Sequence, residues 1–317
     1  MSQGSSQSAL RAAGPVAETL LQASGVLVVG GTLIFAGVMV LLVLAVRRRN
    51  GTVNTRRWLI GGGLVFPTVV LAALFAYSEW HRPPWRPVPP PDALIVGVTG
   101  HMWWWEVRYR APATGAEVVT ANEIRIPIGR PVYFGLGSAD VIHSFWVPSL
   151  GGKMDMLPGR VQHLQLQADR PGTWRGQCAE YCGEQHARMA LHVVAEEPAA
   201  FDAWLAAQAR PAAVSPTSSP ASSPDIERGR EAFLAHRCNA CHTVRGVSEE
   251  SRLGPDLTHV GSRLHLGAGT VANEPAQLAA WVAHTQQLKP GARMPSSGER
   301  IGEADLQRIA AWLAQLK

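Results

Sequence analysis

Apolar residues are concentrated in two long runs near the start of the chain. Residues 26–46 are almost wholly apolar, and a second apolar run covers residues 58–77. A helix over the first run would be about 31 Å long, enough to cross the hydrocarbon core of a bilayer. The pattern predicts a transmembrane helical hairpin over residues 25–80. A cleaved signal peptide is the alternative for the first run, which its length, its late start and the second run disfavour.

The pattern changes after residue 92. Short apolar runs at residues 93–99 and 123–128 lie between Gly and Pro breaks, and residues 163–167 alternate strictly between polar and apolar. Such segments are typical of a β-sandwich or barrel. We therefore predict a β-domain over residues 92–205, which a helix at residues 201–208 closes.

The last third of the chain has helical periodicity. One amphipathic face repeats at helical spacing and comprises Leu306, Ile309, Ala310, Leu313 and Leu316. The pattern over residues 226–236 predicts another helix, so we expect residues 225–317 to form a helical domain. Residues 211–224 are uncharged and rich in Ser and Pro, a composition that predicts a linker before this domain. Residues 82–91 predict an extended spacer, and residues 1–24 a flexible terminus or a processed leader.

Positive charge is concentrated beside the apolar runs. Of the net charge of +5, residues 1–80 hold six Arg against two Glu, and five of these Arg lie between the runs. The positive-inside rule places that connection in the cytoplasm, so both ends of the hairpin and all later residues lie outside. Acidic and basic residues nearly balance in the rest of the chain, which disfavours nucleic acid as a partner.

Residues 178–189, CAEYCGEQHARM, gather soft metal ligands in one loop. Thiolate, thioether and imidazole ligands together select copper among the common metals. Cys178 and Cys182 can each present a sulfur to the same two ions, so the loop favours a dinuclear, thiolate-bridged copper centre. His186 would cap one copper, and Met189 would be a weak axial ligand.

A second imidazole is needed, and His143 in residues 140–146 is the best candidate. The backbone carbonyl of Glu180, between the two thiols, could fill the remaining position. Two alternatives stay open for the cysteines: a disulfide beside a surface His, and a zinc site of two Cys and two His. Zinc gains little from the thioether of Met189, which disfavours that alternative.

Residues 238–242, CNACH, match the attachment motif of a covalent haem c. Cys238 and Cys241 would form the thioether bonds, and His242 would be the proximal iron ligand. Met294 is the only methionine after the motif, and we predict it as the sixth ligand; a Met/His pair raises the haem potential.

Three histidines are the alternatives to that sixth ligand: His259, His265 and His284. A redox dithiol or half of a zinc site is the alternative to the haem motif itself. With all four cysteines assigned, none is left for a structural disulfide. Covalent haem and dinuclear copper together indicate the extracytoplasmic side of a bacterial membrane.

Four segments carry a resemblance to a known family. GHMWWW at residues 100–105, DVIHSF at 140–145, KMDMLPGR at 153–160 and the copper loop, in this order after a hairpin, resemble subunit II of cytochrome c oxidase. The resemblance covers residues 25–205 and implies a cupredoxin fold with the dinuclear CuA centre. Residues 225–317 are similar to the all-α class I cytochromes c, in which a loop like GPDL at residues 254–257 covers the proximal His. The expected fold class is thus a multidomain membrane protein.

The resemblance also implies roles for individual residues. Trp103 would lie beside copper on the electron entry route, while the two tryptophans after it suit ordinary packing or an interfacial belt. Glu180 would give a carboxylate to a Mg site shared with subunit I, and Asp155 and Arg160 would face that subunit. Glu79 lies at the outer end of the second run and is not assigned to a proton path.

The expected function is that of subunit II of a haem-copper terminal oxidase. The chain would pass electrons from haem c to CuA and on to subunit I, which reduces O2 to water coupled to proton translocation. Partners would be subunit I, subunit III, and cytochrome c or an upstream complex as donor. The location would be the bacterial inner membrane, crossed twice, with both chain ends on the periplasmic side.

Two functional alternatives remain at this stage. One is the small subunit of a CuA-containing nitric oxide reductase, which is built on a similar plan. The other is a non-enzymatic, membrane-anchored copper or electron carrier.

Overall fold

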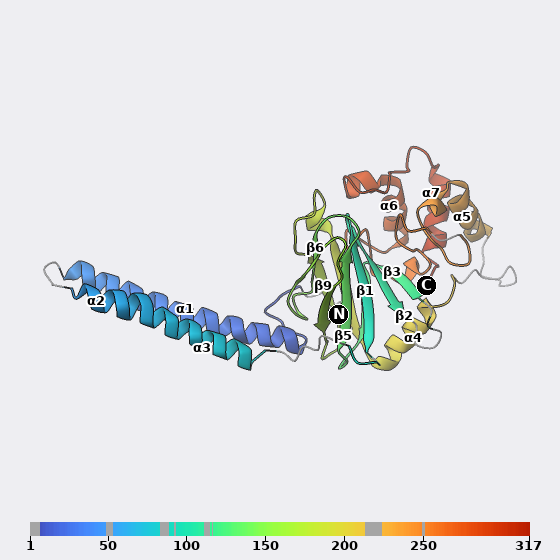
Figure 1. Ribbon diagram of the computed structural model, residues 1–317. Helices are drawn as coiled ribbons and strands as arrows, with labels where there is room; N and C mark the ends of the chain where they lie inside the picture. The colour runs from blue at the N-terminus through green and yellow to red at the C-terminus, as the bar shows by residue number, and fades with distance from the viewer. Residues whose placement is uncertain are drawn as a thin grey trace.

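The computed structural model describes residues 7–48, 53–82, 89–91, 93–110, 115, 117–212, 224–248 and 251–317. Two long apolar helices, a β-sandwich and a helical region follow one another along the chain (Figure 1). Most of the predicted spacer at residues 82–91 and of the predicted linker at residues 211–224 lies outside the described residues.

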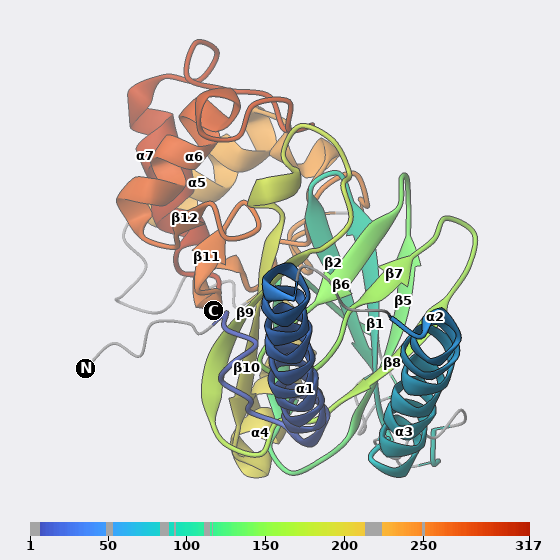
Figure 2. The same cartoon turned by 90° about the vertical axis from the view of Figure 1, so that its left-hand side faces the viewer.

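The first apolar helix, α1, spans Pro15–Arg47. The second is continuous over three segments: α2 (Thr55–Arg57), η1 (Trp58–Val65) and α3 (Phe66–Trp80). Both are long and apolar enough to cross a membrane, and none of the residues in the apolar stretch of either is buried. They leave the sandwich on the same side (Figure 2). Because their apolar side chains are not buried within the chain, lipid or other helices must cover them.

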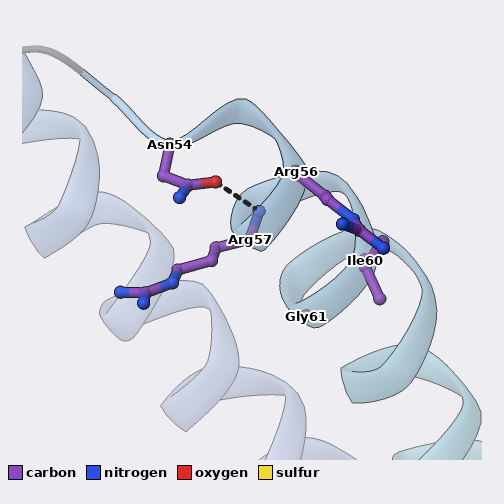
Figure 3. Close-up of a pocket in the computed structure, with 5 residues that line it drawn as sticks. All are labelled: Asn54, Arg56, Arg57, Ile60 and Gly61. Carbon is purple, nitrogen blue, oxygen red and sulfur yellow. Dashed lines mark hydrogen bonds between the residues drawn. The ribbon is translucent and has the colours of Figure 1, made fainter.

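After α2, the second helix continues through a π-helical segment, η1, which ends two residues before Pro67. A proline inside a helix has no N–H for the usual bond and clashes with the carbonyl four residues earlier, and wider turns relieve this. At the basic end, the Oδ1 of Asn54 accepts a 3.1 Å hydrogen bond from the N–H of Arg57 and caps α2 (Figure 3).

Residues 7–24 differ from the flexible terminus that was one of the two predictions for residues 1–24. Helix α1 begins at Pro15, well before the apolar run, and residues 7–14 pack against the sandwich. The N–H of Ala13 donates to Ser149 O at 2.8 Å, and the N–H of Asp169 donates to Ala13 O at 2.9 Å. Ala13 and Ala17 are buried. Small residues without periodicity gave no signal of this packing.

Two five-stranded sheets form the sandwich in the described residues, with strand orders β3-β2-β1-β5-β8 and β4-β10-β9-β6-β7. The strands are β1 (Leu94–His101), β2 (Trp104–Arg110), β3 (Glu117–Ala121), β4 (Glu123–Pro127), β5 (Val132–Ser138), β6 (His143–Trp146), β7 (Met154–Met156), β8 (Gln162–Leu166), β9 (Gly172–Cys178) and β10 (Ala190–Glu196). The three predicted strands correspond to β1, β4 and β8. The helix predicted at residues 201–208 lies within α4 (Pro198–Gln208).

Large aromatic side chains fill the space between the sheets. Trp105, Phe134 and Phe145 are at most 1% exposed, and Trp105 meets Phe145 edge-on with ring centroids 6.0 Å apart. Burying one such side chain contributes about 1.5–3 kcal/mol. Because Phe145 lies on β6 and pairs with Cys178 of β9, this core fixes the strands that carry the predicted copper ligands.

The C-terminal region contains α5 (Pro224–Ala235), η3 (Cys238–Ala240), η4 (Val260–Ser262), α6 (Pro275–Leu288) and α7 (Glu303–Leu313). Helices α5 and α7 pack face to face, with the rings of Phe233 and Trp312 5.0 Å apart. Gly229 permits this crossing, since a Cβ there would lie 2.2 Å from Arg308 O. Both predicted helices are confirmed. A small hairpin of β11 (His265–Leu266) and β12 (Val271–Ala272) adds strand to a region expected to be all-α.

Candidate copper and haem centres

Pairing of β6 with β9 brings the predicted copper ligands together. Phe145 pairs with Cys178, so His143 lies near the end of β9, where the ligand loop begins. The N–H of Ala179 then donates to Ser144 O at 2.9 Å, and the N–H of Cys178 donates to Met189 O at 2.9 Å. The loop is therefore closed at its base by backbone bonds before any metal is considered.

The six predicted copper ligands form one cluster. The Sγ of Cys178 lies 3.8 Å from the Sγ of Cys182, 3.8 Å from His143 Nδ1 and 3.1 Å from Glu180 O. The Sγ of Cys182 lies 3.6 Å from His186 Nδ1 and 3.8 Å from Met189 Sδ. Each thiol thus has its own imidazole, and the two thiols face each other between them.

Most of this cluster is shielded from water. His143 is fully buried, and Cys178, Cys182 and Met189 are 4% exposed or less, whereas His186 and Glu180 are half-buried. The hydrogen bond from Cys182 lowers the pKa of the Cys178 thiol to about 3, and the same contact raises the pKa of Cys182. Because the thiolate is the metal-binding form, Cys178 is ready for a cation.

Asp140 supports the cluster from outside, which the sequence analysis missed. Its Oδ1 lies 2.8 Å from His143 Nε2, and its Oδ2 accepts a 2.8 Å bond from the N–H of Met102. The Nε2 of His143 is thereby engaged, and Nδ1 is left facing the sulfur. A carboxylate on the outer nitrogen of a metal-binding imidazole is a common arrangement, and its position three residues before His143 was the available signal.

The donor set fits two copper ions. The ligand atoms of His143, Cys178 and Cys182 all lie within 4.8 Å of one another. The sulfurs are 3.8 Å apart, whereas a disulfide needs about 2.05 Å, so the disulfide alternative does not describe this structure. Two central sulfurs with separate outer ligands suit a pair of soft ions better than one tetrahedral zinc.

Trp103 lies against the copper loop. Its Nε1 donates to Cys182 O at 2.8 Å, and the ring is partly buried on the sandwich core. Trp105 is fully buried in that core, and Trp104 stacks on His101 with centroids 4.4 Å apart. Packing therefore accounts for Trp104 and Trp105.

The attachment motif begins in η3. Cys238 is half-buried and Cys241 is exposed, and both are free thiols. The Nδ1 of His242 lies 2.8 Å from Pro255 O, which leaves Nε2 available for an iron. Gly254 lies so close that a Cβ there would be 2.7 Å from His242 Cε1. Residues 254–257 therefore cover the proximal His, and the donors fit a covalent haem.

The sixth iron ligand remains a prediction. Met294 is half-buried against the hydrophobic cluster of the haem region, and its carbonyl accepts a 2.7 Å bond from Gln286 Nε2. The rival histidines are engaged or positioned elsewhere. His259 Nε2 lies 3.0 Å from Arg210 O, His265 stacks on a histidine of the sandwich at 4.2 Å, and His284 is exposed.

The predicted subunit-facing residues lie on the surface near the copper loop. Lys153 Nζ lies 2.9 Å from Asp155 Oδ1 and 3.6 Å from Glu180 Oε2. Arg160 is exposed. The two oxygen-bearing groups of Glu180 thus face different ways: its backbone carbonyl faces the Sγ of Cys178, and its carboxylate faces Lys153 at the surface.

Comparisons with known proteins identify related families. Residues 111–196 match the family model for cytochrome c oxidase subunit II, periplasmic domain, and residues 226–317 match that for cytochrome c. Cytochrome c oxidase subunit 2 of Alkalihalophilus pseudofirmus is 35% identical over 258 residues, covering 80% of this chain and 69% of the relative. The Bacillus subtilis protein of the same name is 30% identical, covering 71% of this chain and 63% of the relative.

A solved structure is also similar. The periplasmic domain of cytochrome oxidase subunit II of Bradyrhizobium japonicum is 30% identical, covering 38% of this chain and 95% of that one, with a TM-score of 0.34. The relatives favour the oxidase over the nitric oxide reductase and the non-enzymatic carrier. The chain belongs to the cytochrome c oxidase subunit II family and carries a cytochrome c region after the family's copper-binding region.

Proposed function

We propose that this chain is the electron-entry subunit of a haem-copper terminal oxidase and holds two redox centres, one haem c and one dinuclear copper. When bound, these groups would supply one-electron redox chemistry, with no bond made or broken. The observation that carries the proposal is the buried cluster of two thiols, each with its own imidazole.

The protein's own contribution at copper is rigidity and exclusion of water. Cys178, Cys182, His143 and His186 would hold the copper ions, and Met189 and the carbonyl of Glu180 would complete the set of donors. Strands β6 and β9 fix His143 and Cys178, and backbone hydrogen bonds close the base of the loop that carries the other ligands, so the ligands need to move little when the charge changes.

The protein's contribution at the haem is attachment and orientation. Cys238 and Cys241 would hold the haem covalently, His242 would bind iron through Nε2, and Met294 would be the sixth ligand. Burial lowers the pKa of His242, and Pro255 O fixes its ring, so the neutral imidazole is kept for iron.

The surface around the ligand loops supports docking on subunit I. Val141, Ile142 and Tyr181 are exposed apolar or aromatic residues in the segments that carry His143 and Cys182. Exposed apolar side chains grouped at a functional site are typical of protein contacts. Glu180 offers one carboxylate, the ligand type that Mg²⁺ prefers, and the partner subunit would supply other ligands.

The proposed setting is a bacterial inner membrane, with the sandwich and haem region on the periplasmic side. The basic connection between the helices supports a cytoplasmic position for that end. A soluble cytochrome c or an upstream complex would be the donor to the haem, subunit III a further partner, and oxygen reduction with proton translocation the work of subunit I.

Metal analysis with optical and electron-paramagnetic spectra of the full chain tests the proposal. We expect two copper ions sharing one unpaired electron and one low-spin haem c. Cys182→Ser should abolish the copper signal and leave the haem signal intact. A single copper per chain, or loss of both signals together in the variant, would contradict the assignment.

A further inference from the structure

A lysine is buried between the haem region and the copper loop. Lys289 directly follows α6 and is 3% exposed. Its Nζ donates three hydrogen bonds, to Trp103 O at 2.9 Å, Arg188 O at 2.9 Å and Gly267 O at 2.8 Å. An ammonium has three N–H donors, so the match with three acceptors is complete. Burying a charge is costly, and lysine is rarely buried unless its charge is satisfied in this way.

The three acceptors belong to three separate segments. Trp103 lies between β1 and β2 and contacts Cys182 O through its ring. Arg188 lies in η2 (His186–Arg188), between two predicted copper ligands. Gly267 belongs to the β11–β12 hairpin of the haem region. One side chain therefore joins the haem region to both segments that border the copper cluster.

Neighbouring contacts extend this junction along residues 288–294, the docking segment. Arg188 Nη1 donates to Leu288 O at 2.7 Å. A Cβ at Gly291 would lie 2.5 Å from Glu184 Oε2 and 3.5 Å from Trp103 Cη2, so Gly291 packs against the copper loop and the Trp103 ring. Arg293 Nη2 lies 3.8 Å from Asp140 Oδ2, but its side chain is 63% exposed. Exposed ion pairs contribute little, so Lys289 is the central contact of the segment.

A continuous bonded route results. The carbonyl of Cys182 accepts from the Trp103 ring, and the carbonyl of Trp103 accepts from Lys289. From Lys289 the backbone runs through the docking segment to Met294. The loop that carries the predicted iron ligand is thus anchored on the residue beside a predicted bridging thiol.

We propose that Lys289 is a positioning residue for electron transfer, which holds the haem region in one fixed arrangement on the copper region. This inference rests on the proposed function. Electron transfer slows steeply with separation, and a tethered domain without a fixed contact would spend its time over many separations. Removing the three donors of Lys289 would release the docking segment without touching a ligand.

Lysine labelling of the unmodified full chain tests the docked arrangement. The chain has three lysines, Lys153, Lys289 and Lys317. An acetylating reagent at pH 8, followed by mass spectrometry, should modify Lys289 at least tenfold more slowly than the other two. Labelling as fast as Lys317 would overturn the proposal.

The variant Lys289→Met keeps the length of the stem and removes the donors, and Lys317→Met is the matched surface control. In the full chain we expect intramolecular electron transfer after flash reduction of the haem to slow at least tenfold in Lys289→Met only. The magnetic relaxation enhancement between ferric haem and the copper pair should weaken in parallel. An unchanged rate and unchanged enhancement would overturn the inference.

Copper content, haem content and both optical spectra of the same samples separate this inference from the proposed function. Normal contents and spectra with a slowed rate support both. Absence of the paired-copper signal in the unmodified chain would remove the proposed function itself. Because labelling needs no variant, the inference can still fail if Lys289→Met does not fold.

Discussion

The copper cluster and the haem motif place their cysteines in opposite surroundings. Cys178 and Cys182 are 4% exposed and belong to a cluster whose members hold one another, whereas Cys238 is half-buried and Cys241 is exposed. The copper ligands come from two paired strands and one loop. The proposed iron ligands come from distant segments, and the later one lies in a segment anchored on the other region. The copper site is therefore organised by its own fold, while the haem site depends on docking as well.

Core truncations in each region would test this independence most strongly. Phe145→Ala and Phe233→Ala remove side chains that are at most 1% exposed, and each should destabilise its own region by about 3–5 kcal/mol. Phe145→Ala should lower the melting temperature followed by copper absorbance, and Phe233→Ala the one followed by haem absorbance. Equal shifts of both signals in either variant would mean that the regions unfold as one unit.

Asp140→Asn probes the support of the copper ligand His143. We expect copper affinity to fall about 10–100-fold, because the charge that orients the imidazole and raises its basicity is lost. Competition with a chelator measures this, and Asp202→Asn, at an exposed site, is the control. The haem spectrum should not change. A marked change in the haem spectrum with little loss of copper affinity would contradict the role of Asp140 at the copper cluster.

Gly254→Ala tests the cover of the proximal imidazole. A methyl group there would lie 2.7 Å from His242 Cε1, so the ring or the loop must shift, at a cost of about 1–3 kcal/mol. We expect an altered haem potential and optical spectrum, with copper unaffected. Gly302→Ala is the matched control, since a Cβ at that position would meet nothing within 4 Å. If the two variants had the same haem potential and optical spectrum, the loop at residues 254–257 would have to shift at no measurable cost.

Protonation of His192 at low pH should weaken the contact between the sandwich and the haem region. Burial lowers its pKa to about 4, and His265, Arg175 and Glu123 face it from the segments packed around it. The unfolded chain takes up a proton near the ordinary value of 6.5 before the folded one does. His192 therefore makes its full contribution to the free energy of unfolding above pH 6.5. This contribution is lost as pH falls toward 4, and about 1–2 kcal/mol of it is lost at pH 5.

Chemical denaturation of the full chain at pH 8 and pH 5 measures this loss. His192→Asn should flatten the pH dependence, whereas the exposed His163→Asn should leave it unchanged. A pH dependence that persists in His192→Asn would assign the acid sensitivity to another group.

The clustering of the six predicted copper ligands could be anticipated because five of them lie within residues 178–189, and ligand type with spacing was sufficient; their role as ligands stays a prediction. The strands followed from alternation, and the haem motif from its own spacing. Lys289 could not be found this way, because its partners lie at Trp103, Arg188 and Gly267, and a lone lysine carries no sign of burial. Met294 was chosen by elimination, and it stays a prediction.

The contact of residues 7–14 with the sandwich has a consequence for how the chain is threaded through a bilayer. The strand-connecting loops near Ser149 and Asp169 can receive the first residues only if both lie in the same compartment. The backbone hydrogen bonds therefore require an even number of membrane crossings between residues 7–14 and the sandwich. This requirement does not depend on the positive-inside rule. A fusion partner placed before residues 7–14 would have to lie on the same side of the bilayer as the β-rich region.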